Sequence, residues 1–148
     1  MEGASASIME QFWFTSTLFD VDPEEDQETN PGIYGKALAF WLKKKLIAAG
    51  RPVEDVIPED WGWCVLCSRK PFMLWIGCGS MFADDSAGED DLPPRKENLV
   101  WTCFVQAEVP VLKKLFKKIV TTDQVNALAS DLKSILESDS GIKMVDEP

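Results

Sequence analysis

The feature that most constrains the fold is an apolar run that directly follows two adjacent carboxylates, Glu59 and Asp60. In an extended strand, successive side chains point to opposite faces of the sheet. One face then carries Trp61, Trp63, Val65 and Cys67, and the other carries Gly62, Cys64, Leu66 and Ser68. Because both faces are largely apolar, the run predicts an interior strand of a sheet that is covered on both sides.

The rest of the chain predicts an α+β domain with a mainly antiparallel sheet of about four to five strands and three helices. The expected order is β-α-β-β-β-β-α-α, with a short tail strand possible near the C-terminus. The expected elements are strands over 11–19, 52–58, 61–67, 72–78 and 99–106, helices over 30–49, from 110 and from 121, and the tail strand over 142–145. Residues 1–10 are expected to be a flexible N-terminus, and residues 11–145 a single domain. With several strands apolar on both faces, we expect the first helix on one face and the last two on the other, or a partner surface.

The first helix has clear boundary signals in the sequence. Asn30 fits an N-cap and Pro31 the first helical position, while Gly50 fits a stop after Ala49. Gly35 in this helix and Gly62 in the apolar run lack side chains, so both positions predict a close approach of another segment.

Two acidic segments interrupt the apolar pattern, over 20–30 and 84–98. A calcium loop that began at Asp20 would need glycine at its sixth position and glutamate at its twelfth. The chain has Glu25 and Pro31 there, so a solvated loop is the better interpretation. The segment over 84–98 is long for a loop in a compact domain, and we interpret it as a disordered excursion between two strands.

Charge and composition narrow the classes of partner. A net charge of -10 disfavours binding to nucleic-acid phosphates, which requires lysine and arginine, and permits a basic partner. No run approaches the roughly 18 apolar residues of a membrane span. The N-terminus has no basic region before an apolar core, so it does not fit a secretory signal. We therefore expect a cytoplasmic protein without membrane or nucleic-acid partners.

The four cysteines predict buried small hydrophobic side chains. Cys64 and Cys67 have the C-x-x-C spelling, but this odd spacing in a strand puts the two thiols on opposite faces. A zinc site needs a second pair of ligands, and the chain contains no histidine. The sequence therefore predicts no metal site and no cofactor.

Glu59, Asp60, Trp61 and Trp63 are the candidate binding residues. A carboxylate against an indole can have a raised pKa and act as an acid. The alternative is structural: a carboxylate that caps the turn, or pairs with a lysine of the first helix. We expect about three of the six tryptophans to be core residues, because each buries a large apolar area.

Two motifs suggest a resemblance. The run Asn30-Pro-Gly-Ile-Tyr-Gly and the later run Pro58-Glu-Asp-Trp-Gly-Trp are similar to sequences in a group of small uncharacterised bacterial proteins. The likeness covers roughly the first half of the chain, and it implies no activity.

No nucleophile elbow, phosphate loop or dinucleotide motif is present. The sequence therefore favours a non-enzymatic cytosolic domain that binds another protein. One concrete form is an acidic inhibitor of a basic toxin or nuclease, as an immunity protein is, because opposite charges speed such encounters. The alternative is a small-ligand binder or an enzyme with a carboxylate and tryptophan pocket. A homodimer through an apolar sheet face is also open.

Overall fold

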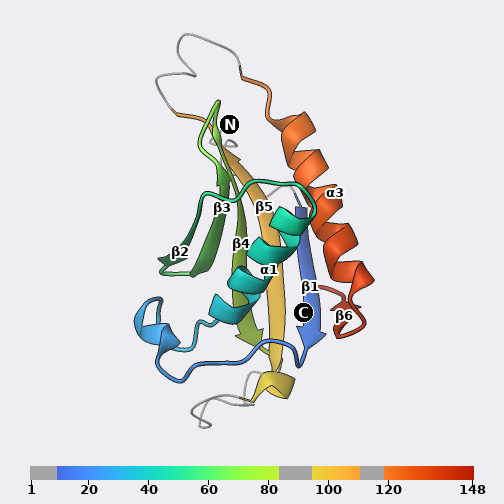
Figure 1. Cartoon of the computed structure of the whole chain (residues 1–148). Helices are drawn as coiled ribbons and strands as arrows, with labels where there is room; N and C mark the ends of the chain where they lie inside the picture. The colour runs from blue at the N-terminus through green and yellow to red at the C-terminus, as the bar shows by residue number, and fades with distance from the viewer. Residues whose placement is uncertain (1–9, 84–94, 111–118) are drawn as a thin grey trace.

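One antiparallel sheet organises the chain (Figure 1). The computed structural model describes residues 10–83, 95–110 and 119–148. The strands there are β1 (Glu10–Ser16), β2 (Asp55–Glu59), β3 (Gly62–Ser68), β4 (Met73–Phe82), β5 (Leu99–Glu108) and β6 (Ile142–Val145). Their order across the sheet is β2-β3-β4-β5-β1-β6, and neighbouring strands are antiparallel. The α+β class is confirmed, with six strands rather than four to five.

Two α-helices, α1 (Lys36–Ala48) and α3 (Thr122–Ser138), and two 3-10 turns, η2 (Glu25–Gln27) and η3 (Lys96–Asn98), complete the described elements. The helix expected from Pro110 and the flexible N-terminus fall mostly on 111–118 and 1–9, outside the described residues. Most of the acidic segment over 84–98 also lies outside them, and η3 occupies its end. Neither described helix has the length and apolar character needed to cross a bilayer.

Both described helices pack on the same face of the sheet, so the prediction that α3 covers the face opposite α1 is wrong (Figure 1). The alternative, a partner surface on the opposite face, stays a prediction. Helix α1 contacts β2, β3 and β4, while α3 contacts β5, β1 and β6. Fully buried Leu42 of α1 and Leu132 of α3 belong to the same core as Val65 and Ile76. Two helices side by side are wide enough to cover six strands, so each needs only one apolar stripe.

The opposite face of the sheet holds a smaller apolar cluster, and no helix of the described residues crosses it. Leu66 is fully buried there, and Trp75 is buried beside it, against the Phe104 ring. Both faces of β3 are therefore buried, as predicted for an interior strand, and β3 lies between β2 and β4.

Several finer predictions are confirmed. Trp63, Trp75 and Trp101 are the buried tryptophans of the described residues, three of the six in the chain. The expected tail strand β6 exists and pairs with β1. In the observed order, β2 lies at the edge of the sheet and contains Pro58. Proline on an edge strand removes one donor that another chain could pair with.

Candidate functional site

The hairpin between β2 and β3 carries the four candidate residues. Glu59 pairs with Gly62 across the hairpin, so Asp60 and Trp61 form its two-residue turn. Glu59 and Asp60 are exposed. Trp61 is 40% exposed, whereas Trp63 is only 2% exposed. The structure therefore gathers three of the four at an exposed tip and places the fourth in the core, without a shared pocket.

The two tryptophans of the hairpin lie on opposite sides of the sheet, and the prediction that they share a face is wrong. The Trp63 ring lies on the helix side, with Lys36 Nζ 5.4 Å and the Phe40 ring 6.5 Å from its centroid. The Trp61 ring stacks on Trp75 on the other side, at 5.4 Å between centroids and 25° between planes. Strand alternation does not apply to Trp61, because Trp61 belongs to the turn.

Two glycines meet at one carbonyl group of β4. Gly62 has φ +152°, and a Cβ built on it would overlap the carbonyl oxygen of Cys78. A Cβ on Gly35, just before α1, would lie 3.1 Å from the same oxygen. The predicted close approaches are confirmed. The hairpin tip and the segment before α1 therefore both pack against Cys78.

Glu25 in the acidic loop is buried and caps α1 from a distance. Its Oε2 accepts hydrogen bonds from the amides of Gly35 (3.2 Å) and Lys36 (3.0 Å), and its Oε1 accepts one from the amide of Asp22 (3.0 Å). The first amides of a helix have no partner within the helix, and a carboxylate there also faces the positive end of the helix dipole. The Glu25 side chain thus supplies both an acceptor for these amides and a negative charge at the start of the helix.

This contact explains why the predicted start of α1 is wrong. Asn30 and Pro31 do not begin the helix but form a turn, in which the Ile33 amide donates to the Asn30 carbonyl at 2.9 Å. The helix begins at Lys36, after Gly35, which has no side chain to supply a cap. Asn30 does favour a turn, as its residue type indicates. The acceptor that fixes the helix start is instead Glu25, ten residues before Gly35.

The neighbouring Asp26 further orders the loop. Its Oδ2 accepts hydrogen bonds from the Gly32 amide at 3.0 Å and from the Tyr34 hydroxyl at 3.3 Å. Burial, followed by the Asp26 carboxylate, raises the pKa of Tyr34 to about 12. The segment 20–30 is thus a largely exposed loop before α1, as interpreted, but the carboxylates of Glu25 and Asp26 have structural roles that the interpretation did not include.

The other carboxylates of this region point outward and define a surface that we name the acidic end. Its members are Asp20, Asp22, Glu24 and Glu28 of the loop, with Glu59 and Asp60 of the hairpin tip. Glu28 pairs with Lys36 at 3.2 Å, and Asp20 pairs with Lys96 at 2.5 Å. Within the described residues the other four acidic-end carboxylates have no ion pair. The acidic end therefore keeps a net negative charge.

A hollow of about 300 Å³ opens at the acidic end. Its walls combine charged and apolar groups, namely Asp20, Val21, Asp22, Glu25, Lys36, Ala37 and Phe40. Phe40 is 41% exposed, although it belongs to α1. An exposed ring beside the Asp22 carboxylate, which has no ion pair within the described residues, is suited to contact with a macromolecule that has both apolar and cationic groups.

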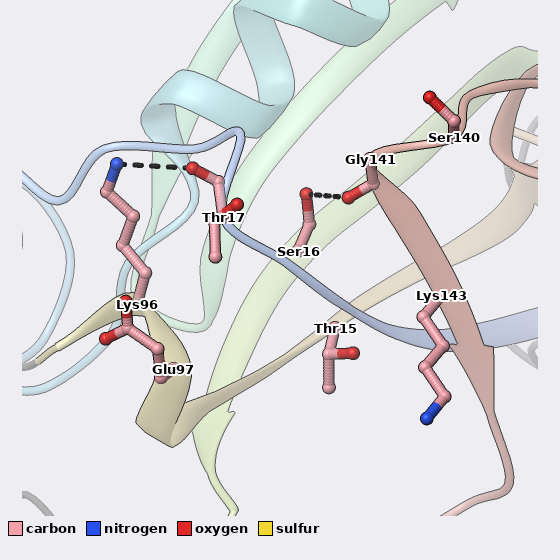
Figure 2. A pocket seen from close by; sticks show the side chains of 8 residues that line it. All are labelled: Thr15, Ser16, Thr17, Lys96, Glu97, Ser140, Gly141 and Lys143. Carbon is pink, nitrogen blue, oxygen red and sulfur yellow. Dashed lines mark hydrogen bonds between the residues drawn. The ribbon is translucent and has the colours of Figure 1, made fainter.

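A second hollow, of about 450 Å³, lies between the end of β1, η3 and the start of β6 (Figure 2). Ser16 Oγ donates to the Gly141 carbonyl at 2.6 Å, and Lys96 Nζ donates to the Thr17 carbonyl at 3.2 Å. The amines of Lys96 and Lys143 lie at opposite ends of the hollow (Figure 2). Two of its polar side chains, those of Ser16 and Lys96, therefore join the surrounding elements, and its two lysines do not converge on one ligand.

The cysteines are all buried and free, as expected. Cys64 lies on the helix-free face and Cys67 in the main core, which confirms that the C-x-x-C thiols point to opposite faces. Cys78 and Cys103 face each other on β4 and β5, with 3.9 Å between their sulfur atoms. Among the described residues, no group of cysteines and carboxylates is arranged to hold a metal ion.

The buried thiols and Tyr34 predict a loss of stability at alkaline pH. Burial raises the pKa of Cys64 from 9.0 to about 12, with a smaller effect of Glu59, and raises the pKa of Cys67 from 9.0 to about 11. Above about pH 9 the unfolded chain therefore loses protons that the folded chain keeps, and the free energy of unfolding falls as pH rises. We expect the midpoint of urea unfolding to fall steadily from about pH 9 to about pH 11. The variant Cys64→Ala should show a shallower fall, and an equal slope in both proteins would contradict the assignment.

Sequence reasoning missed Glu25, Asp26 and the partners of the Trp61 ring. No local signal singles out Glu25, because Asn30 and Pro31 already provide an apparent helix start in the sequence. Trp75 and Phe104 meet Trp61 only through strand pairing between β4 and β5, which nothing in the local sequence specifies. No family model, curated protein or solved structure matches the chain, so the geometry of the acidic end is the basis for any functional conclusion.

Proposed function

We propose that this domain is a non-enzymatic binding module that receives a basic protein on its acidic end. In its most concrete form it is an inhibitor that occupies the cationic active surface of a toxin or nuclease, as an immunity protein does. The observation that supports this most is that two acidic segments separate in sequence, 20–28 and 59–60, are both anchored at the same point of β4. Glu25 accepts from the Gly35 amide, and Gly35 and Gly62 both lie against the Cys78 carbonyl. The exposed Phe40 ring lies on the helix side of the sheet, and the exposed Trp61 ring lies on the other side.

The fixed conformation of the acidic loop also supports the proposed binding function. Glu25 and Asp26 fix the loop through five hydrogen bonds to backbone amides and to Tyr34. The outward carboxylates of the same loop are therefore held in place before any partner arrives. A surface that is already ordered loses less conformational entropy on binding, which favours affinity.

The charge of the whole chain works in the same direction. A net charge of -10 attracts a basic partner over distance, and the free carboxylates of the acidic end direct the encounter to one surface. Steering of this kind raises the association rate and weakens with salt.

The test is binding to an arginine-rich peptide and to a folded basic protein, measured by calorimetry at low and high salt. The variants Asp22→Asn/Glu24→Gln and Glu59→Gln/Asp60→Asn each remove two carboxylates that have no ion pair within the described residues. Each should weaken binding at low salt by about tenfold, mainly through the association rate. Asp22→Asn keeps an oxygen that can accept the Glu24 amide, as Asp22 Oδ1 does at 2.9 Å.

The matched control is Asp123→Asn/Glu137→Gln, which removes two exposed carboxylates from α3. All three variants change the net charge equally, so only position distinguishes them. Equal weakening by all three would mean that overall charge and not the acidic end is responsible. Absence of salt-dependent binding to any basic probe would overturn the proposed function.

A further inference from the structure

Trp61 is a fixed, half-exposed ring at the tip of the hairpin. Its inner side stacks on Trp75, and its centroid lies 5.4 Å from that of Phe104, with 53° between the planes. Phe104 in turn lies over Gly77, where a Cβ would overlap the Phe104 ring. The indole is thus held from beneath by two other rings, one of which lies over a glycine, while 40% of Trp61 remains exposed.

The chain uses its own lysines to cover two other indoles. Lys36 Nζ lies 5.4 Å from the Trp63 ring, and Lys45 Nζ lies 5.7 Å from the Trp41 ring. In the part of the chain that the structure describes, no lysine or arginine lies over Trp61. The residues directly before it, Glu59 and Asp60, are instead exposed carboxylates. Trp61 therefore offers an aromatic face without a cation, in a negative setting.

We propose that Trp61 is the platform on which an arginine of the basic partner stacks, with Glu59 or Asp60 receiving its guanidinium hydrogens. This proposal rests on the function proposed above and specifies the chemistry of the partner. A planar guanidinium can stack on an indole and at the same time donate paired hydrogen bonds to a carboxylate. A lysine ammonium is a more strongly hydrated point charge and cannot match both contacts as well. The charge of the tip and its exposed ring thus select arginine over lysine.

The experiment compares hexa-arginine and hexa-lysine peptides, which carry equal charge. The wild-type protein is expected to bind the arginine peptide about five- to tenfold more tightly than the lysine peptide. Trp61→Leu should remove most of this preference while leaving salt-dependent binding of both peptides, and Trp61→Phe should keep part of it. Thermal unfolding of each variant shows that the fold is retained.

A second measurement reports on the contact itself. In the 15N-labelled protein each of the six tryptophans has one indole N–H signal, and the signal lost in Trp61→Phe identifies Trp61. Addition of the arginine peptide should shift this signal more than the lysine peptide does. If Trp61→Leu keeps the wild-type preference while Glu59→Gln/Asp60→Asn weakens binding, the arginine platform is wrong and the proposed function stands. If no basic peptide binds in a salt-dependent way, both fail together.

Discussion

Replacing Glu25 with alanine is expected to lower the free energy of unfolding by about 3 kcal/mol or more. The substitution leaves three amides without their acceptor, those of Asp22, Gly35 and Lys36. Glu25 is only 3% exposed, so water cannot easily replace the lost carboxylate. The loss should also loosen the first turn of α1, because Gly35 supplies no side-chain cap.

Urea unfolding followed by tryptophan fluorescence measures this effect. Glu24→Ala is the matched control, since Glu24 is exposed and its side chain makes no hydrogen bond among the described residues. Its effect should stay within about 0.5 kcal/mol. Glu25→Gln should be intermediate, because an amide has one accepting oxygen where Glu25 uses two. A Glu25→Ala protein as stable as the control would show that the loop does not cap α1.

Replacing Gly62 with alanine is the second substitution with a large expected effect. It should lower the free energy of unfolding by about 3 kcal/mol or more. Two physical causes act together. A φ of +152° is unfavourable for any residue with a Cβ, and the new methyl group would overlap the carbonyl oxygen of Cys78. Because the obstacle is backbone and not a flexible side chain, the hairpin itself must move.

Gly79→Ala on the adjacent strand is the control for this prediction. A Cβ on Gly79 would lie 3.4 Å from the nearest atom, the carbonyl oxygen of Trp61, which is at the edge of ordinary contact. Gly79→Ala should lower the free energy of unfolding by no more than about 1 kcal/mol. Thermal or urea unfolding measures both variants. The assignment would fail if Gly62→Ala and Gly79→Ala had the same stability.

The sequence predicts the strands of the sheet better than the side of the sheet on which the helices pack. Alternation and composition identify β3 as interior, and they place Cys64 and Cys67 on opposite faces. The helical spacing of apolar residues also marks the stripe of α1, whose Leu38, Leu42 and Leu46 are buried. It does not say on which side of the sheet a helix crosses. The side depends on how wide a face each helix covers and on where its loops lead.

The candidate site is only half predictable, for a different reason. Glu59, Asp60 and Trp61 attract attention locally, because charge meets large aromatic residues there. The two-residue turn that separates Trp61 from the strand follows from pairing between Glu59 and Gly62, which is a tertiary result. The role of Glu25 likewise depends on a helix start at Lys36, eleven residues away.

The shared seat of Gly35 and Gly62 on the Cys78 carbonyl has a mechanical consequence. Neither segment has room to move toward β4 there, because each already lies against the same carbonyl oxygen of that strand. The hairpin tip and the start of α1 therefore share one point of reference in the sheet, and a displacement of Cys78 would shift both.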